Sequence, residues 1–109
     1  MIMIKVNDHV NQCYSNSDGD VIRVLIADHL GKGQKVSVSF DKIDSISASF
    51  VNSAFIDLLE MYTFDTIRQL LGFADSSKSI NNLIKKRFSF EVNERSYKKS
   101  PKGMMLQPN

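Results

Sequence analysis

The stretch Asp44–Phe55, DSISASFVNSAF, holds four serines at the point where an apolar pattern of helical spacing begins. A helix start leaves free backbone N–H groups and carries a partial positive charge of about half a unit. A serine there can accept an N–H hydrogen bond as the N-cap, which typically contributes about 1 kcal/mol, and a phosphate is also favoured there. The sequence therefore leaves two roles open for Ser49: the cap of a helix or a site of phosphorylation.

The other residue types that carry chemistry are sparse. Cys13 has no histidine or basic neighbour in NQCYSN, so we expect an inert thiol rather than a nucleophile. His9 and His29 are not joined by further ligands at metal-site spacing, and a zinc site needs three or four ligands. Asp41 and Asp44 fit turn formers better than a pair of catalytic carboxylates. We therefore expect no enzyme, no metal and no cofactor.

Length and composition indicate an ordinary globular domain. The chain has 109 residues, 42% of them hydrophobic and 24% charged. The longest apolar run is about four residues, far short of the roughly 20 that span a bilayer. The first residues, MIMIKVNDH, lack the basic segment and cleavage pattern of a signal peptide. A lone cysteine cannot form an internal disulfide, so we expect a cytoplasmic protein.

Charge is distributed unevenly along the chain. Residues 1–77 carry six Lys or Arg and ten acidic residues, whereas residues 78–109 carry eight Lys or Arg against two glutamates. The cations of the basic third are Lys78, Lys85, Lys86, Arg87, Arg95, Lys98, Lys99 and Lys102. With Phe88, Phe90 and Tyr97 interleaved, this segment could bind nucleic acid. The alternative is a solvated helix end with core phenylalanines and a loose tail, and no helix-turn-helix, zinc-finger or RNP pattern is present.

The pattern of the first half of the chain predicts a helix with one strand before it and one strand after it. Residues 2–6 read as a short strand, followed by a polar loop. A helix begins with Ser17 as its N-cap and ends at Gly31 and Gly33. Its predicted buried stripe consists of Ile22, Leu25, Ile26 and Leu30. Residues 36–40 alternate apolar and serine residues, which is typical of a strand.

The second half begins with a helix at Ser49. Its stripe of Val51, Ala54, Phe55, Leu58, Leu59 and Tyr62 predicts one helix through residue 62. We expect a strand over 66–73, a helix capped by Ser76 or Ser77, and a short strand over 88–94. The stripe of that helix is Ile80, Leu83, Ile84 and Phe88. Alternating strands and helices predict right-handed crossovers and a partly parallel sheet. A single domain is expected over 1–92, with a basic tail over 93–109.

The stretch VSVSFDKIDSISASFVNSAFIDLLE, with the helix before it, resembles the STAS-like proteins of bacteria, small relatives of the anti-sigma-factor antagonist (STAS) domain. The resemblance covers residues 17–90. Its matching residues are Ile22, Arg23, Phe40, Asp41, Ile46, Ser47, Ser49 and Phe50. It implies a STAS-like α/β fold in which a mixed, partly parallel sheet packs against about three helices.

The resemblance also implies a use for Ser49. STAS antagonists carry a D-S-[ST]-G-L step at this strand-to-helix turn, and a kinase of the histidine-kinase-like ATPase fold phosphorylates a serine there. Ser49 falls at that position, whereas Ser47, Ala48 and Phe50 stand where the pattern has an acid, a hydroxyl residue and a glycine. A phosphate adds about −1.5 to −2 charges and changes which partner is held.

The leading hypothesis is a non-enzymatic bacterial module that regulates by binding a protein partner, and the implied partner is a histidine-kinase-like ATPase. The predicted partner-binding residues are Arg23, Asp41, Asp44, Ser47, Ser49 and Phe50. Two alternatives stay open. One is a nucleic-acid-associated regulator that uses Lys85, Lys86, Arg87, Arg95, Lys98 and Lys99. The other is an accessory or inhibitor protein of a mobile element.

Overall fold

The computed structural model describes residues 1–99, with side chains through residue 94. Its strands are β1 (Ile2–Lys5), β2 (Val36–Ser39) and β3 (Leu71–Ala74). Its α-helices are α1 (Asn16–Leu30), α2 (Ala48–Ala54), α3 (Phe64–Leu70) and α4 (Lys78–Lys99), and two short 3₁₀ segments are η1 (Val6–Asp8) and η2 (Ile56–Glu60). The predicted alternation of strands and helices is confirmed, and α3 is an element that the sequence analysis did not predict.

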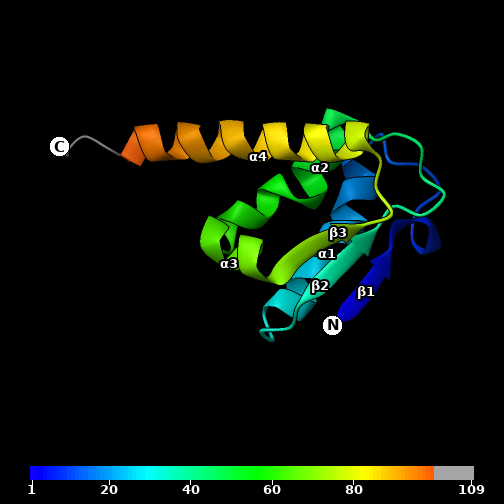
Figure 1. Ribbon diagram of the computed structural model, residues 1–109. Coiled ribbons are helices and arrows are strands. Elements are labelled where there is room, and N and C mark those ends of the chain that lie inside the picture. The colour runs from blue at the N-terminus through cyan, green and yellow to red at the C-terminus, as the bar shows by residue number, and fades with distance from the viewer. Residues whose placement is uncertain (100–109) are drawn as a thin grey trace.

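The three strands form one sheet in the order β1-β2-β3, and both pairings are parallel. Val38 of β2 lies between Ile4 and Phe73. The strands therefore end at the same edge of the sheet, where Figure 1 shows the loops that follow β1, β2 and β3. The predicted parallel character is confirmed, and the part of the sheet that is described is wholly rather than partly parallel.

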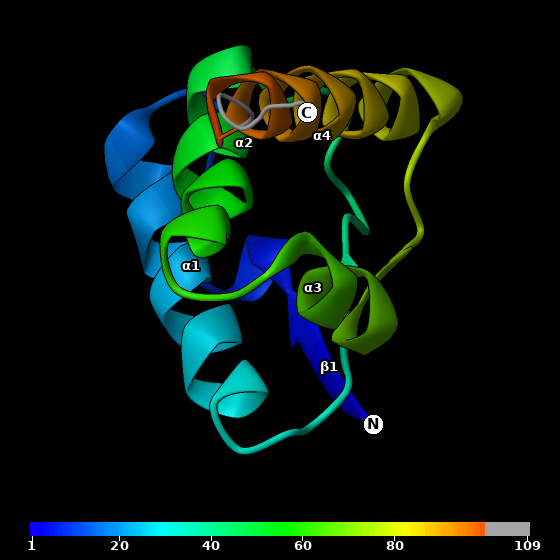
Figure 2. The ribbon, with the colours of Figure 1, turned by 90° about the vertical axis from the view of Figure 1, so that its left-hand side faces the viewer.

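Helix α1 lies against one face of the sheet, and α2 packs along α1 (Figures 1 and 2). The core between them and the sheet contains the predicted stripe residues Ile22, Ile26 and Leu30, all buried. Its centre is aromatic: the Phe55 ring lies 6.1 Å from Phe50 and 5.2 Å from the Phe73 ring of β3, both edge-on. Edge-to-face pairs add stabilisation beyond their buried area.

Helix α1 begins two residues earlier than expected. The Asp18 N–H donates to Ser15 Oγ at 3.1 Å, so Ser15 rather than Ser17 is the N-cap. Shortly after the cap, a Cβ at Gly19 would lie 2.7 Å from Phe50 O and 2.7 Å from Ser53 Cβ. A residue without a side chain at Gly19 is therefore what lets α1 approach α2 so closely.

The stripe over residues 51–62 is not one helix. Helix α2 ends at Ala54, and Phe55 leaves helical geometry at φ −122° and ψ −48° before η2 begins. The stripe residues Val51, Ala54, Phe55 and Leu58 are nevertheless fully buried. Helical spacing predicted which side chains face the core, but both α and 3₁₀ turns can satisfy that spacing over a few residues.

The strand predicted over 66–73 is half wrong. Thr63 caps α3 by accepting the Thr66 N–H at 3.2 Å, and the helix runs to Leu70. The strand β3 takes only the last part of the predicted range. The sequence analysis did not identify Thr63 as a helix cap, because the apolar residues that follow it were interpreted as a strand.

Helix α4 replaces the strand predicted over 88–94, which is wrong. Ser77 Oγ accepts the Ile80 N–H at 3.1 Å, as expected of the cap. The helix then continues through Lys99, across the expected boundary at residue 92 and into the expected tail, and Figure 1 shows it extending past the rest of the fold. Lys102 and the apolar Met104–Leu106 lie outside the described residues.

Candidate partner-binding surface

The loops at the carboxyl edge of the sheet contain two unusual backbone positions. Lys42, after β2, has φ 65°, and Asp75, after β3, has φ 53°. A non-glycine residue with positive φ is uncommon and persists only where its surroundings impose it. Both lie beside the strand ends, which is where parallel sheets commonly place binding residues.

A buried serine connects these two loops. Ser39, the last residue of β2, is completely buried and donates from Oγ to Asp75 Oδ2 at 2.6 Å. The same oxygen accepts the Asp41 N–H at 3.3 Å. This pair of bonds holds the backbone of Asp41 while its carboxylate stays exposed, as a surface residue requires.

Ser47, and not Ser49, is the N-cap of α2. Its Oγ accepts the Phe50 N–H at 3.1 Å and donates to Tyr14 O at 2.9 Å. Its own N–H donates to Cys13 O at 2.9 Å. The Ser47 hydroxyl thus both donates and accepts in joining the helix start to the loop that precedes α1. The N-cap role, one of the two that the sequence left open for Ser49, belongs to Ser47.

Ser49 is the second residue of α2, and its side chain is exposed. Its carbonyl oxygen accepts from Asn16 Nδ2 at 3.2 Å. Within residues 1–99, its hydroxyl takes part in no hydrogen bond. This hydroxyl is therefore accessible at a helix start, where anionic groups are favoured.

Phe50 and Arg23 do not lie on the expected surface. Phe50 is 0% exposed and belongs to the aromatic core. Arg23 donates from Nη1 to Asp20 Oδ1 at 2.6 Å and to Ser53 O at 2.9 Å, and Asp57 lies 3.7 Å away. Arg23 therefore ties α1 to the last turn of α2, away from the helix start. Hydrogen bonding to a helix-terminal carbonyl explains why an arginine suits this position.

Tyr14 is a surface residue that the sequence analysis missed. It is 54% exposed, and its hydroxyl lies 2.9 Å from Ser45 Oγ, which links the loops before α1 and α2. These loops border a hollow of about 180 Å³ that Asp44 and Lys42 also line. The sequence did contain a signal for this exposure, because Tyr14 stands in the polar stretch NQCYSN and belongs to no apolar pattern of helical or strand spacing. The hollow and the exposed Ser49 together make the start of α2 the candidate site.

Cys13 is buried, and its thiol is not reactive in this setting. Burial, with a smaller effect of the Asp18 carboxylate, raises the pKa of Cys13 to about 11. Only the thiolate is an effective nucleophile, so Cys13 stays protonated near neutral pH. In the described part of the chain, no three His, Cys, Asp or Glu side chains come together as metal ligands.

The basic residues of α4 whose side chains are described differ in their surroundings. Arg87 donates to Asn52 Oδ1 at 2.9 Å, pairs with Glu91 at 3.3 Å and lies over the Phe90 ring. Phe88 is buried, so it is not an exposed stacking residue. The exposed cations Lys85 and Lys86 are adjacent and point to different sides of the helix. The side chains of Arg95, Lys98 and Lys99 lie outside the described part.

The three parallel strands, connected through helices, define a small α/β domain. A family described as the STAS-like domain of unknown function (DUF4325) matches residues 18–81, more than half of the chain. The chain therefore belongs to this STAS-like family, as the resemblance indicated. The match runs from α1 into the first turn of α4 and includes the start of α2. Comparison with curated proteins and with solved structures gave no match.

Residues 1–99 contain no candidate membrane-spanning helix. None of the helices there combines the length and the apolar character that crossing a bilayer requires.

Proposed function

We propose that this protein is a non-enzymatic regulatory module that binds a protein partner through the α2-start surface. We define this surface by the exposed residues Tyr14, Asp41, Asp44, Ser45 and Ser49. Support comes from the hydrogen bonds of Ser47, which fix the helix start against the preceding loop and leave Ser49 exposed. A rigid backbone that presents polar side chains loses little conformational entropy on binding a partner.

Phosphorylation of Ser49 is the proposed control. The observation that carries it is the exposed, unbonded Ser49 hydroxyl at the second position of α2. A phosphate there would add about −1.5 to −2 charges beside backbone N–H groups of the first turn. The Asn16 side-chain amide donates to Ser49 O at 3.2 Å and to Ser53 Oγ at 2.6 Å, so it braces the backbone beside Ser49. The proposed partner and kinase is an ATPase of the histidine-kinase-like fold.

Ser79 supplies a matched control for this proposal. It is the second residue of α4, it is exposed, and Ser77 caps that helix as Ser47 caps α2. Incubating the full chain with a purified histidine-kinase-like ATPase from the source cell and Mg-ATP should add one phosphate. Intact-mass measurement should show this addition in the Ser79→Ala variant and not in the Ser49→Ala variant.

Partner binding is the second measurement. Ser49→Asp should change the affinity for that ATPase by about tenfold or more, whereas Ser79→Asp should leave it unchanged. Unmodified Ser49 together with equal binding by both aspartate variants would overturn the switch. Binding that is also insensitive to Asp44→Lys and Tyr14→Ala would overturn the surface itself.

A further inference from the structure

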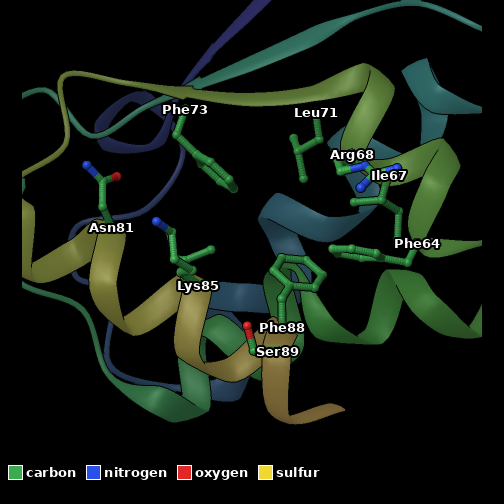
Figure 3. A pocket seen from close by; sticks show the side chains of 10 residues that line it. Phe64, Ile67, Arg68, Leu71, Phe73, Asn81, Lys85, Phe88 and Ser89 are labelled. Atoms are coloured by element: carbon green, nitrogen blue, oxygen red, sulfur yellow. The ribbon is translucent and has the colours of Figure 1, made fainter. Parts of the chain in front are cut away.

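An apolar groove lies between α3, β3 and α4, apart from the α2-start surface. Its volume is about 400 Å³, which falls in the range of roughly 300–1,000 Å³ typical of ligand sites. Figure 3 shows side chains converging on it from all three elements. The apolar lining consists of Phe64, Ile67, Leu71, Phe73, Ile84 and Phe88. We call this feature the α3–α4 groove.

Aromatic side chains form much of the wall of the α3–α4 groove. The rings of Phe64 and Phe88 lie 5.7 Å apart and join α3 to α4, while Phe73 enters from β3 (Figure 3). Because the groove is bordered by three elements and has a volume of about 400 Å³, its size suits a small molecule. A floor of aromatic and branched side chains can hold a hydrocarbon group, since it removes apolar surface from water.

The charged residues that line the groove are all cations. Arg68 comes from α3 and Lys85 from α4, and none of the described Asp or Glu residues lines the groove. Arg68 pairs with Asp65 at 2.9 Å, but both side chains are more than 60% exposed, at 66% and 76%. Such exposed pairs contribute little, so the guanidinium can exchange this partner for a ligand. Among the described residues, Lys85 has no ion pair.

We propose that the α3–α4 groove binds a small apolar carboxylate, an aliphatic or aromatic acid. Its hydrocarbon part would fill the apolar floor, and its carboxylate would lie at the rim, where Arg68 and Lys85 supply positive charge. Arginine binds carboxylates with directional hydrogen bonds, and lysine supplies a compact charge. A polyphosphate or a bare ion fits poorly, because the floor offers few polar groups. The groove shares no residue with the α2-start surface, so neither proposal depends on the other.

Octanoate is the test probe, with octan-1-ol and octylamine as probes of the same chain and different head group. Calorimetric titration of the full chain should give one octanoate site with a Kd below about 1 mM. The alcohol and the amine should bind at least about tenfold more weakly, because hydrogen bonds to a charged group are worth more than neutral ones. Amide chemical shifts should change at residues 64–73 and 81–89.

Charge reversal at the rim tests the contact residues. Arg68→Glu with Lys85→Glu should weaken octanoate binding by about tenfold or more, and both positions are exposed, so the fold should be retained. Lys86→Glu makes the same charge change on the next residue of α4, which does not line the groove, and should have no effect. Ser89→Trp, which places a large ring at the groove, should abolish binding.

Three results would overturn the proposal. Octylamine binding as tightly as octanoate would show that the cationic rim is not used. Equal effects of Lys85→Glu and Lys86→Glu would show only a general charge effect. Octanoate binding that appears only after removal of residues 100–109 would mean that the chain itself occupies the groove.

Discussion

Helices α2 and α4 begin with the same local pattern, a serine, one residue, a second serine and a buried apolar residue. At α2 the cap is Ser47, which accepts the Phe50 N–H at 3.1 Å. At α4 the cap is Ser77, which accepts the Ile80 N–H at the same distance of 3.1 Å. The two caps satisfy one helical N–H each by the same chemistry.

The two starts differ in what surrounds them. The Ser47 hydroxyl also donates to Tyr14 O, and its N–H donates to Cys13 O, so two long-range bonds fix the start of α2. Near the start of α4, Ser76 Oγ donates only to Asn81 Oδ1, five residues away. A short sequence pattern thus builds the same cap twice, but only tertiary contacts make one of them a junction between loops.

Truncating the apolar residue after each cap should produce the largest effects. Phe50→Ala should destabilise the fold by about 3–5 kcal/mol and Ile80→Ala by about 2–5 kcal/mol. We expect Phe50→Ala to cost more, because its ring packs against Phe55 in the centre of the core. Urea unfolding followed by circular dichroism measures both. A larger loss for Ile80→Ala would contradict the view that α2 is the more deeply embedded helix.

Adding one methyl group at Gly19 should destabilise the packing of α1 against α2 and leave the start of α4 unchanged. A Cβ there would meet Phe50 O and Ser53 Cβ at 2.7 Å, so the two helices must separate. Gly19→Ala should cost about 1–3 kcal/mol, as overpacking does. Gly72→Ala is the control, since nothing lies within 4 Å of a Cβ at Gly72. The measurement is the thermal unfolding midpoint, which should be lower for Gly19→Ala than for Gly72→Ala. Equal midpoints would contradict the close packing of α1 against α2.

Raising the pH should lower the stability of the fold through Cys13, whose backbone oxygen accepts the Ser47 N–H at the start of α2. Its pKa is raised to about 11 from an ordinary value of 9.0, because burial disfavours the thiolate. The protonated Cys13 thiol therefore contributes its full stabilisation of the folded state below pH 9, where both folded and unfolded chains keep the proton. This contribution is lost as the pH rises through 11. The loss should reach about 2 kcal/mol at pH 11.

The measurement compares urea unfolding of the wild type and of Cys13→Ala between pH 8 and pH 11. The variant lacks the thiol, so the stability difference between the two proteins should shrink over this range. A difference that stays constant with pH would show that the thiol titrates alike in the folded and unfolded chains.

Removing each cap should give the smallest effects and separate the two starts most directly. Ser77→Ala should cost about 1 kcal/mol, the usual value of an N-cap. Ser47→Ala should cost about 0.5–1.5 kcal/mol more, because its hydrogen bond to Tyr14 O is also lost. Amide hydrogen exchange should quicken around Tyr14 in Ser47→Ala alone. Equal stability losses would indicate that the bond to Tyr14 contributes nothing.

Much of the fold could be predicted because its signals are local or periodic. The strands at 2–5 and 36–39 and the core stripe of α1 follow from apolar spacing. The parallel sheet follows from the alternation of strands and helices. The errors fall where two assignments satisfy the same spacing: α3 and β3 share the range read as one strand, and α4 continues where a strand was expected.

The candidate site was predicted in position but not in its details. The turn before α2 was found because serines precede an apolar helical pattern. Which serine serves as the cap could not be predicted, since Ser47 and Ser49 both precede the stripe. The bond between Ser47 and Tyr14 O, across 33 residues, decides it. Likewise, Arg23 and Phe50 were placed on the surface by the family pattern, but packing against α2 and in the core removes them from it.

The sequence alone determined the α/β class, the family and the helix start at the centre of the candidate site, because these depend on periodicity and on residues close in the chain. Only the tertiary structure decided that the Ser47 hydroxyl is hydrogen-bonded while that of Ser49 is unbonded among the described residues, that Cys13 is buried, and that α3, β3 and α4 border an apolar groove. Those features depend on contacts between residues far apart in the chain, and no local pattern encodes which distant side chain will be the neighbour.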